Sequence, residues 1–375
     1  MIVIFYGTSA ELIKMVGVIQ RVPRSEILLI CSSQHHNGLK RVHKQLDIYP
    51  DIELSDGWFG KDVMTIPQMA GMMIKTHAKF ISKISALRKQ IKLHDRQQGT
   101  KSVAIVHGDT LTTVIGSYMG RWLGLPVAHV EAGLRTHNWR SPFPEEIDRR
   151  IAAKFARIHY PPNDEAEQAL RNEKAKGEIV PTHYNTAKDA IEQSDRFVSH
   201  DFAELKLPKK YCLVLLHRTE LIESKSDLEN ILKVVHDHAS PKTPVVFTEH
   251  STTWEKIRSY KLDHYLKKDG LTVIPKQPYF DFMEIVRRSE YIVTDGGGLQ
   301  EDAYFLCIPT IIHRKVTERP DGIGFNAEIS GFDAKKVTAF LKNHTNKRDL
   351  KRSVESISPS QIVVDHLYSH KFFVK

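Results

Sequence analysis

The sequence lacks long apolar runs, paired cysteines and a secretory leader, and each absence argues against a class of protein. Its apolar runs are only as long as a strand, so no transmembrane span is expected. Cys31, Cys212 and Cys307 show no CxxC spacing, which argues against a disulfide or a cysteine metal site and favours a reducing cytoplasm. A glycine and two charged residues interrupt the N-terminal apolar run, so no signal peptide is expected.

The composition is that of an ordinary globular protein with a basic balance. The 375 residues are 41% hydrophobic and 26% charged, with a net charge of +9. This length predicts about two to three domains. Lysine and arginine are spread along the chain, without the aromatic-interleaved basic stretches that bind single-stranded nucleic acid. We therefore expect neither a nucleic acid nor a membrane as partner, and favour small anionic substrates.

The first half of the chain alternates short β-rich runs with helical patterns. Each run ends at a glycine or a polar cluster and is followed by an amphipathic segment, a pattern that predicts a parallel, doubly wound sheet. The predicted strands are Ile2–Tyr6, Glu26–Ser33, 103–108 and 126–131.

The same alternation restarts in the second half, from Tyr211 onward. We place a domain boundary near Tyr184, which divides the chain into residues 1–184 and 185–355. A short C-terminal helix within 356–375 is expected to pack back on the first domain. The predicted fold class is α/β, with two Rossmann-like doubly wound parallel-sheet domains that face each other across a cleft.

Carboxylates gather between Val103 and Arg149. Asp109 and Glu131 each follow a predicted buried strand, and Glu145 opens the next helix with Arg149 one turn later. Residues just past the carboxyl ends of parallel strands line the ligand crevice, so these groups suit acid/base chemistry. The alternative is a set of solvated charges. A metal site that includes His107 is disfavoured because no HExxH or fixed ligand spacing is present.

The second domain carries a glycine turn that favours an anion. Asp295 ends a predicted strand, and the following Gly296, Gly297 and Gly298 let a ligand approach the helix N-terminus. The turn is not a Walker A loop, and an ordinary tight turn is the alternative. His217 also follows a strand, and a solvated or structural histidine is its alternative reading.

These motifs together resemble the non-hydrolysing UDP-N-acetylglucosamine 2-epimerases. HGDT, VEAGLRT, SPFPEE-x-x-R, DGGG-x-QE and TERP occur in the family's order, along with GT-x-x-E-x-x-K near the N-terminus. The resemblance implies a GT-B-type fold and an isomerase that interconverts UDP-GlcNAc and UDP-ManNAc through a 2-acetamidoglucal. It also implies a homodimer that needs neither a metal nor a nicotinamide cofactor, and a place in capsule or lipopolysaccharide synthesis.

The resemblance also assigns roles to residues. It gives Asp109, Glu131 and Glu145 the acid/base work, makes Arg149 their support, and makes His217 a diphosphate contact. The residues that match the substrate-binding set are Lys14, Gly296, Gly297, Gly298, Asp302 and Arg319.

The sequence departs from the family at several binding positions. Ser9 stands where the family has an arginine near the phosphates, Gly296 replaces a serine, and Asp302 replaces a glutamate. No match to the family's allosteric arginine-glutamate pair occurs around Lys61 to Thr65. These changes predict retained acid/base chemistry with altered nucleotide contacts. The rivals are a hydrolysing 2-epimerase, a GT-B glycosyltransferase and a non-catalytic nucleotide-sugar binding protein.

Overall fold

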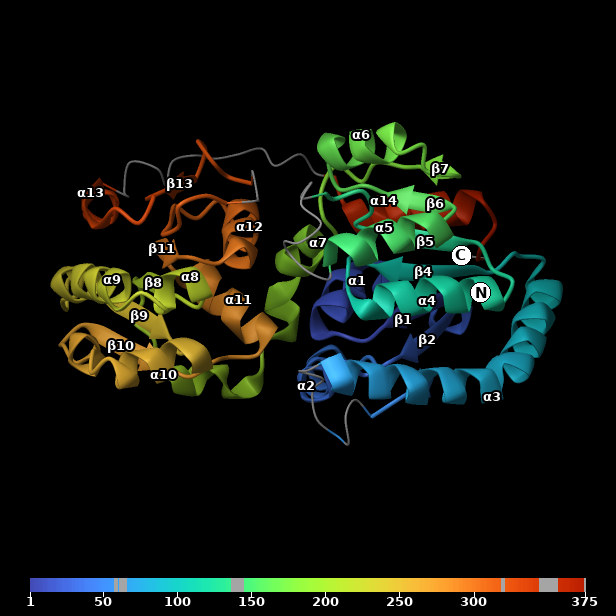
Figure 1. Cartoon of the computed structure of the whole chain (residues 1–375), viewed down its shortest axis with the longest axis horizontal. Coiled ribbons are helices and arrows are strands. Elements are labelled where there is room, and N and C mark those ends of the chain that lie inside the picture. Colours follow the sequence, from blue (N-terminus) through green and yellow to red (C-terminus); the bar gives the residue numbers. More distant parts are fainter. Residues whose placement is uncertain (57–59, 61–65, 136–144, 318–320, 344–356, 374–375) are drawn as a thin grey trace. The chain divides into compact units, whose positions relative to one another are not determined.

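The computed structural model describes residues 1–56, 60, 66–135, 145–317, 321–343 and 357–373. The chain forms two compact units (Figure 1): Met1–Glu192 with Ser356–Lys375, and Gln193–Glu355. The boundary predicted near Tyr184 precedes helix α7 (Ala187–Glu192), which lies in the first unit because it packs on helix α1 (Ser9–Arg21).

The first unit is built on a seven-stranded parallel sheet in the order β3-β2-β1-β4-β5-β6-β7. Its central strands are buried at every position, as expected for a parallel sheet covered on both faces. The strands are β1 (Ile2–Tyr6), β2 (Ile27–Cys31), β3 (Ile52–Glu53), β4 (Val103–His107), β5 (Val127–Val130), β6 (Ile158–Tyr160) and β7 (Glu178–Ile179).

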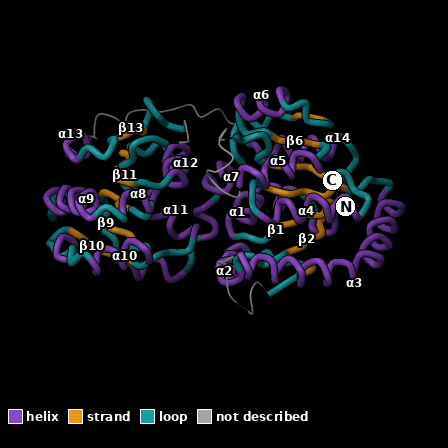
Figure 2. Tube along the Cα trace, in the orientation of Figure 1, coloured by secondary structure: helices purple, strands orange, loops and turns teal. Residues whose placement is uncertain are grey.

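Helices connect and cover these strands (Figure 2). Besides α1 and α7 they are α2 (His36–Leu46), α3 (Ile66–Gln98), α4 (Leu111–Trp122), α5 (Glu145–Phe155), α6 (Asp164–Asn172) and α14 (Pro359–Ser369). Two begin with a threonine capping box, formed by Thr8 at α1 and Thr110 at α4, which satisfies backbone donors that the first turn leaves open. Both caps lie just past a strand end, so they also define the turns at the sheet edge.

The second unit repeats this plan with a six-stranded parallel sheet in the order β10-β9-β8-β11-β12-β13. Its strands are β8 (Cys212–Leu215), β9 (Val245–Thr248), β10 (Leu271–Ile274), β11 (Tyr291–Thr294), β12 (Thr310–Ile312) and β13 (Ala327–Ile329). Its α-helices are α8 (Thr219–Ile222), α9 (Lys225–His238), α10 (Ser251–Ser259), α11 (Tyr279–Arg288), α12 (Gly297–Phe305) and α13 (Ala334–Asn343).

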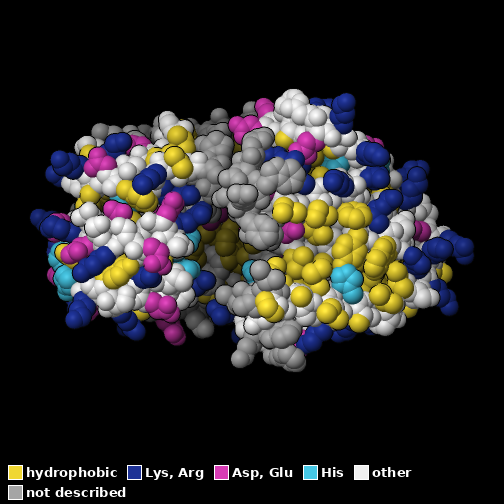
Figure 3. All heavy atoms as spheres, in the orientation of Figure 1, with side chains coloured by type: hydrophobic (Ala, Val, Ile, Leu, Met, Phe, Trp, Pro, Cys, Tyr) yellow, Lys and Arg dark blue, Asp and Glu magenta, His cyan; other side chains and the backbone are white. Residues whose placement is uncertain are grey.

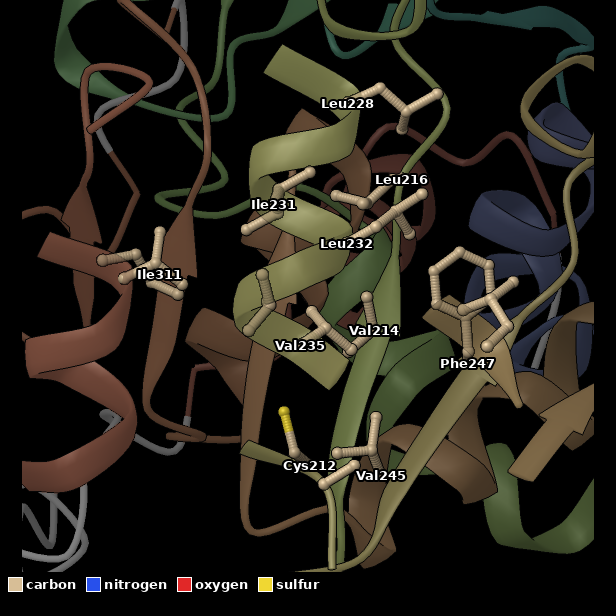
Figure 4. Packing of buried hydrophobic residues seen from close by; sticks show 14 of the residues in the cluster. Cys212, Val214, Leu216, Leu228, Ile231, Leu232, Val235, Val245, Phe247 and Ile311 are labelled. Carbon is tan, nitrogen blue, oxygen red and sulfur yellow. The ribbon is translucent and has the colours of Figure 1, made fainter. Parts of the chain in front are cut away.

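The core of the second unit shows why the elements pack in this way. Helix α9 presents Leu228, Ile231 and Leu232, all fully buried, and strands β8 and β9 present Val214 and Phe247 (Figure 4). Their spacing of three and four along α9 puts the leucines and isoleucine on one face. Alternate residues of the strands meet that face. The two parallel sheets with flanking helices confirm the predicted α/β class.

The sequence pattern missed several short elements and misplaced some ends. Strands β6 and β13 have only three residues each, too few to show a period, and they pair at sheet positions that only the tertiary fold supplies. Helix α3 extends beyond the predicted Met69–Leu93 at both ends. Helix α14 agrees with the predicted C-terminal helix and contacts α1 and α7.

None of the helices in the described parts of the chain combines the length and apolar character that crossing a lipid bilayer requires.

Candidate active site

Both sheets reverse their strand order at one point, and the candidate site residues lie at these points. In the first unit the reversal lies between β1 and β4; in the second it lies between β8 and β11. Open α/β sheets bind ligands outside the carboxyl ends of the strands at such a switch point. Asp109 and His217 follow β4 and β8 at these edges, and Gly296 follows β11.

In the first unit a buried carboxylate shapes the turn after β1. Glu11 Oε2 accepts hydrogen bonds from the backbone N–H groups of Gly7 and Thr8, both at 2.8 Å. Thr110 Oγ1, beyond β4, donates to Glu11 Oε1 at 2.6 Å. Burial raises the pKa of Glu11, and these hydrogen bonds oppose that rise. Glu11 therefore joins the two strand ends at the switch point and acts as a structural residue.

Glu131 lies directly after β5 with a cation and a histidine beside it. Lys14 Nζ, on the next turn of α1 after Glu11, donates to Glu131 Oε2 at 2.8 Å, and His107 Nε2 lies 3.3 Å from the same oxygen. Glu131 has a φ of +64°, a backbone conformation that side chains other than glycine rarely adopt. Strained residues of this kind occur often at functional sites. The lysine predicted as a substrate contact therefore also orients a predicted acid/base residue.

The histidine beside Glu131 is neutral at physiological pH. Burial lowers the pKa of His107 to about 4, helped by the positive charge of Lys14 and opposed by Glu131. On the neighbouring strand, His129 Nε2 lies 2.7 Å from the carbonyl oxygen of Gly108, and burial lowers its pKa to about 3. The ring of His129 thus supports the turn that leads to Asp109, while the ring of His107 lies against Glu131.

Asp109 is paired with the arginine predicted to support it. Arg149 Nη2 donates to Asp109 Oδ2 at 2.5 Å, and Arg149 Nη1 lies 3.6 Å from Glu146 Oε2. Glu146 is fully buried and also binds Arg150. Helix α5 thus holds Arg149 in place from one side while it contacts Asp109 on the other.

The first turn of α5 adds two further carboxylates. Glu145 Oε2 and Asp148 Oδ2 are buried without a hydrogen-bond partner among the described residues. Burial, together with the negative charges of Asp109 and Glu145, raises the pKa of Asp148 to about 7. Asp109, Glu145 and Asp148 are therefore neighbours. With Glu131, we call them the carboxylate cluster.

Two members of this region were outside the predicted catalytic set. Asp148 belongs to the same helix turn as Glu145, and a spacing of three residues is the signal that could have identified it. His107 was weighed only as a metal ligand, whereas the structure pairs it with Glu131. Residues 136–144, which include Ser141 and Pro144 of the SPFPEE motif, lie outside the described residues.

In the second unit a buried aspartate organises the edge. Asp295, fully buried after β11, accepts from the backbone N–H groups of His217 and Arg218 at 2.9–3.0 Å. Its Oδ1 lies 3.4 Å from His217 Nδ1. Burial lowers the pKa of His217, as do the charges of Arg218, Lys276 and Arg314. The lowered pKa favours the uncharged imidazole, which lies among cations that can attract a diphosphate.

The glycine turn lies against this histidine. A Cβ atom on Gly296 would approach His217 Cε1 to 2.5 Å, so the turn passes beside the ring. Gly296 is the N-cap residue of helix α12, and as a glycine it offers no side-chain hydrogen bond to the first turn. Gly298 is exposed, and a Cβ atom at this position would meet no other atom within 4 Å. An uncapped helix N-terminus and small residues suit an anionic ligand. Gly296 therefore lies beside His217, while the binding of a diphosphate by Gly296, Gly297 and Gly298 stays a prediction.

Of the other predicted binding residues, the structure describes Asp302 and the departing position Ser9. Asp302 is partly exposed on α12. Burial raises the pKa of Tyr279, and so do the negative charge of Asp302 and the hydrogen bond between the two side chains. Arg319 and the Lys61–Thr65 segment lie outside the described residues. Ser9 begins α1, one residue beyond the Thr8 cap.

Comparison with known proteins gives a family match over most of the chain. The family model described as UDP-N-acetylglucosamine 2-epimerase matches residues 18–361. A UDP-N-acetylglucosamine 2-epimerase of Bacillus subtilis is 28% identical over 97% of this chain and 94% of its own length. One from Salmonella typhimurium is 28% identical over 89% of this chain and 87% of its own length.

Solved structures agree with the fold. The UDP-GlcNAc 2-epimerase of Methanocaldococcus jannaschii aligns over 98% of this chain and 99% of its own, with a TM-score of 0.80 and 24% identity. A structure of that enzyme in complex with UDP-GlcNAc and UDP aligns over the same shares, with a TM-score of 0.72 and 25% identity. This likeness confirms the predicted fold class for both units.

Proposed function

Because the chain belongs to the UDP-N-acetylglucosamine 2-epimerase family, whose members are isomerases of a nucleotide sugar, we propose that it interconverts UDP-GlcNAc and UDP-ManNAc, or a related UDP-HexNAc pair. The observation that carries this proposal is the carboxylate cluster. Several carboxylates with an arginine and a lysine among them suit a reaction that removes and returns a proton.

The proposed reaction breaks and remakes two bonds of the sugar. One carboxylate takes the proton from C2 while the C1–O bond to UDP breaks, which leaves a 2-acetamidoglucal and UDP. A second carboxylate then returns a proton to the opposite face of C2, and UDP adds back at C1. Removing the proton needs an ionised carboxylate on one face, and returning a proton needs a protonated carboxylate on the other. Asp109, Glu131 and Glu145 are three candidates for these two roles. Arg149 and Lys14 would orient Asp109 and Glu131.

The second unit is proposed to hold the departing UDP. Negative charge develops on the diphosphate as the C1–O bond breaks, and preorganised donors stabilise such charge. Support comes from the N-terminus of α12, from the neutral ring of His217, and from the cations Arg218, Lys276 and Arg314 near that ring. Asp302 is proposed to accept from the ribose hydroxyls.

The departures at Ser9, Gly296 and Asp302 belong to the predicted nucleotide contacts, whereas the acid/base positions are kept. A lost charge-assisted contact at Ser9 costs about 1.5–3 kcal/mol of binding unless another group replaces it. We therefore propose the family's chemistry with altered nucleotide contacts, on UDP-GlcNAc or a modified UDP-HexNAc, in a cytoplasmic pathway that supplies a surface polysaccharide.

The test follows deuterium at C2. The protein is incubated with UDP-GlcNAc, and with other UDP-HexNAc sugars, in heavy water, and the sugar is observed by NMR. Deuterium at C2 with the UDP-sugar intact supports the epimerase, whereas free sugar plus UDP shows a hydrolysing enzyme. If no sugar exchanges its C2 proton although the protein still binds UDP, the protein is a non-catalytic binding protein and the acid/base assignment is wrong.

Asp109→Asn provides the matched variant for this assay. It removes the carboxylate charge at nearly constant shape and should lower turnover by at least about a hundredfold. Its melting temperature and circular dichroism serve as the control for folding. A near-normal rate would exclude Asp109 from the proton transfer.

We also propose that the protein is a homodimer that uses the face of α3 and α4. Ile74, Ile81 and Trp122 are large apolar side chains exposed on these helices, and apolar side chains gather there over the surface (Figure 3). Exposed apolar patches often mark interfaces. Light scattering of the wild type should give twice the mass of one chain. The double variant Ile74→Asp, Ile81→Asp should give the mass of a single chain. A wild-type monomer at micromolar concentration would reject the dimer.

A further inference from the structure

We propose that Glu178, His366 and His370 form a binding site for a divalent transition metal of the zinc class. The three residues lie in the first unit, Glu178 on β7 and His366 on α14, with His370 at the C-terminal end of that helix. None of them belongs to the carboxylate cluster or to the residues proposed to bind UDP. The metal would therefore serve the fold and not the proton transfer.

The ligand atoms already converge on one point. His366 and His370 are separated by four residues, so their rings lie on one face of the helix end, with centroids 4.3 Å apart. His366 Nε2 lies 2.9 Å from Glu178 Oε2, and His370 Nε2 lies 3.4 Å from the same oxygen. One ligand atom from each residue can be chosen so that all three lie within 4.8 Å of one another.

These separations fit tetrahedral coordination. Zinc bonds to histidine nitrogen and carboxylate oxygen are about 2.0–2.2 Å long, so neighbouring ligands of a tetrahedral ion lie roughly 3.3–3.5 Å apart. The two separations from Glu178 Oε2, 2.9 Å and 3.4 Å, differ from these values by only a few tenths of an ångström. The ligand nitrogens of the two histidines lie within 4.8 Å of each other, so the exposed ring of His370 would turn toward the ion on binding. The side chains of His370 and Glu178 are 41% and 53% exposed, which leaves room for a water as fourth ligand. A two-histidine, one-carboxylate set is a common zinc ligand set.

The other ring nitrogens are already held. His370 Nδ1 lies 3.0 Å from the carbonyl oxygen of His366, so a proton on Nδ1 leaves Nε2 unprotonated toward Glu178. His366 Nδ1 lies 2.8 Å from the hydroxyl of Tyr160, a buried residue of β6. Metal-binding histidines usually have such partners for the second nitrogen, because these fix the ring and its tautomer. An ordinary surface ion pair does not need a partner for the second nitrogen of each ring, whereas both rings have one here.

Metal binding requires that the ligand nitrogen carry no proton. Without metal, the short contact between His366 Nε2 and Glu178 is a hydrogen bond, with the proton on the nitrogen and Nδ1 accepting from Tyr160. When the ion binds Nε2, that position gives up its proton. A neutral ring then carries its proton on Nδ1, and a ring that was doubly protonated releases one proton to solvent. Affinity should therefore fall as the solution becomes more acidic.

The site would join distant segments of the first unit. Glu178 and His366 are 188 residues apart in sequence, and α14 contacts both α1 and α7. An ion held by β7 and α14 would fasten the C-terminal helix to the sheet edge. Because α1 carries Glu11 and Lys14, the same fastening would support the helix that faces the carboxylate cluster.

The test uses the full chain after removal of metal with a chelator. Zinc is titrated by calorimetry, and cobalt(II) is titrated as a probe whose absorption reports four-coordinate ligation. We expect one tight zinc site, a rise in melting temperature with zinc, and four-coordinate cobalt absorption. His370→Gln should weaken zinc binding at least about tenfold and remove that absorption.

Two further variants keep the result decisive. His264→Gln is the matched control, because His264 is also exposed and its Nδ1 also lies near a backbone carbonyl, that of Lys261, at 3.1 Å. It should bind zinc like the wild type. Glu178→Gln should weaken binding as His370→Gln does. Equal affinity in wild type and His370→Gln, or equal losses in His370→Gln and His264→Gln, would mean nonspecific histidine binding and overturn the proposal.

Discussion

The contact between Lys14 and Glu131 offers the sharpest test of how the first unit is built. Lys14 Nζ lies 2.8 Å from Glu131 Oε2, and the two side chains are only 20% and 9% exposed. Lys14→Met keeps most of the apolar stem of the lysine and removes its charge. Glu131 then keeps its negative charge in a largely buried place, where an uncompensated charge is costly.

The expected magnitude follows from burial. Charge-assisted hydrogen bonds in partly buried places contribute about 1.5–3 kcal/mol, whereas exposed lysine–carboxylate pairs contribute about 0.2–1 kcal/mol. Lys233 and Asp237 form such an exposed pair at a similar distance, 3.0 Å, with side chains 60% and 59% exposed. The two pairs therefore differ mainly in burial, and the second serves as the control.

A double-mutant cycle measures the difference. Lys14→Met, Glu131→Gln and the double variant are compared with Lys233→Met, Asp237→Asn and their double variant. Stability is read from hydrogen exchange of the backbone amides of β5 for the first pair and of α9 for the second. We expect a coupling energy of about 1.5–3 kcal/mol for the Lys14 pair and a clearly smaller one for the exposed Lys233 pair.

The pKa of His107 gives an independent reading, measured by NMR of the ring. Lys14 lowers this pKa and Glu131 raises it, so Lys14→Met should move it up from about 4 and Glu131→Gln should move it down. Equal coupling in the two pairs, or shifts of His107 in the same direction for both variants, would refute this account of the site.

Two further predictions concern Asp148 and the glycine turn. The pKa of Asp148 is about 7 in the folded protein, above its ordinary 3.8, so the unfolded chain holds fewer protons between these values and stability falls as pH rises through them. Asp148→Asn should therefore stabilise the first unit by about 1–2 kcal/mol at pH 8 and much less at pH 4 in denaturant unfolding; an equal gain at both would contradict the burial argument. Gly296→Ala places a Cβ atom 2.5 Å from His217 Cε1 and should displace the ring, with about tenfold weaker UDP binding by calorimetry at unchanged folding. Unchanged affinity would mean that His217 does not contact the diphosphate.

Local pattern was sufficient for much of the fold. β1 and β4 were predictable because each is a run of apolar, mostly β-branched residues that ends at a glycine or a polar cluster and is followed by a helical pattern. The short strands β6 and β13 were not, because a strand of three residues exists only through its pairing partners. The end of α3 was also missed, since its hydrophobic pattern weakens before the helix ends.

Part of the candidate site was likewise predictable. Asp109, Glu131 and His217 could be placed at one kind of edge because parallel strands end on the same side of a sheet. Apart from Arg149, which the family resemblance placed beside Asp109, their partners could not be predicted. The pKa of Asp148 is high because packing of α5 buries this side chain and brings it beside Asp109, which no local pattern shows.

The sequence by itself therefore determined the order of the strands and helices, the family, and the residue types that follow each strand, because these depend on contacts between near neighbours in the chain. Only the tertiary structure decided which charges meet. Lys14 and Glu131 are 117 residues apart, and Glu178 and His366 are 188 apart. Such pairs form because the sheet order brings distant strand ends and helix faces together, and no local pattern records that order.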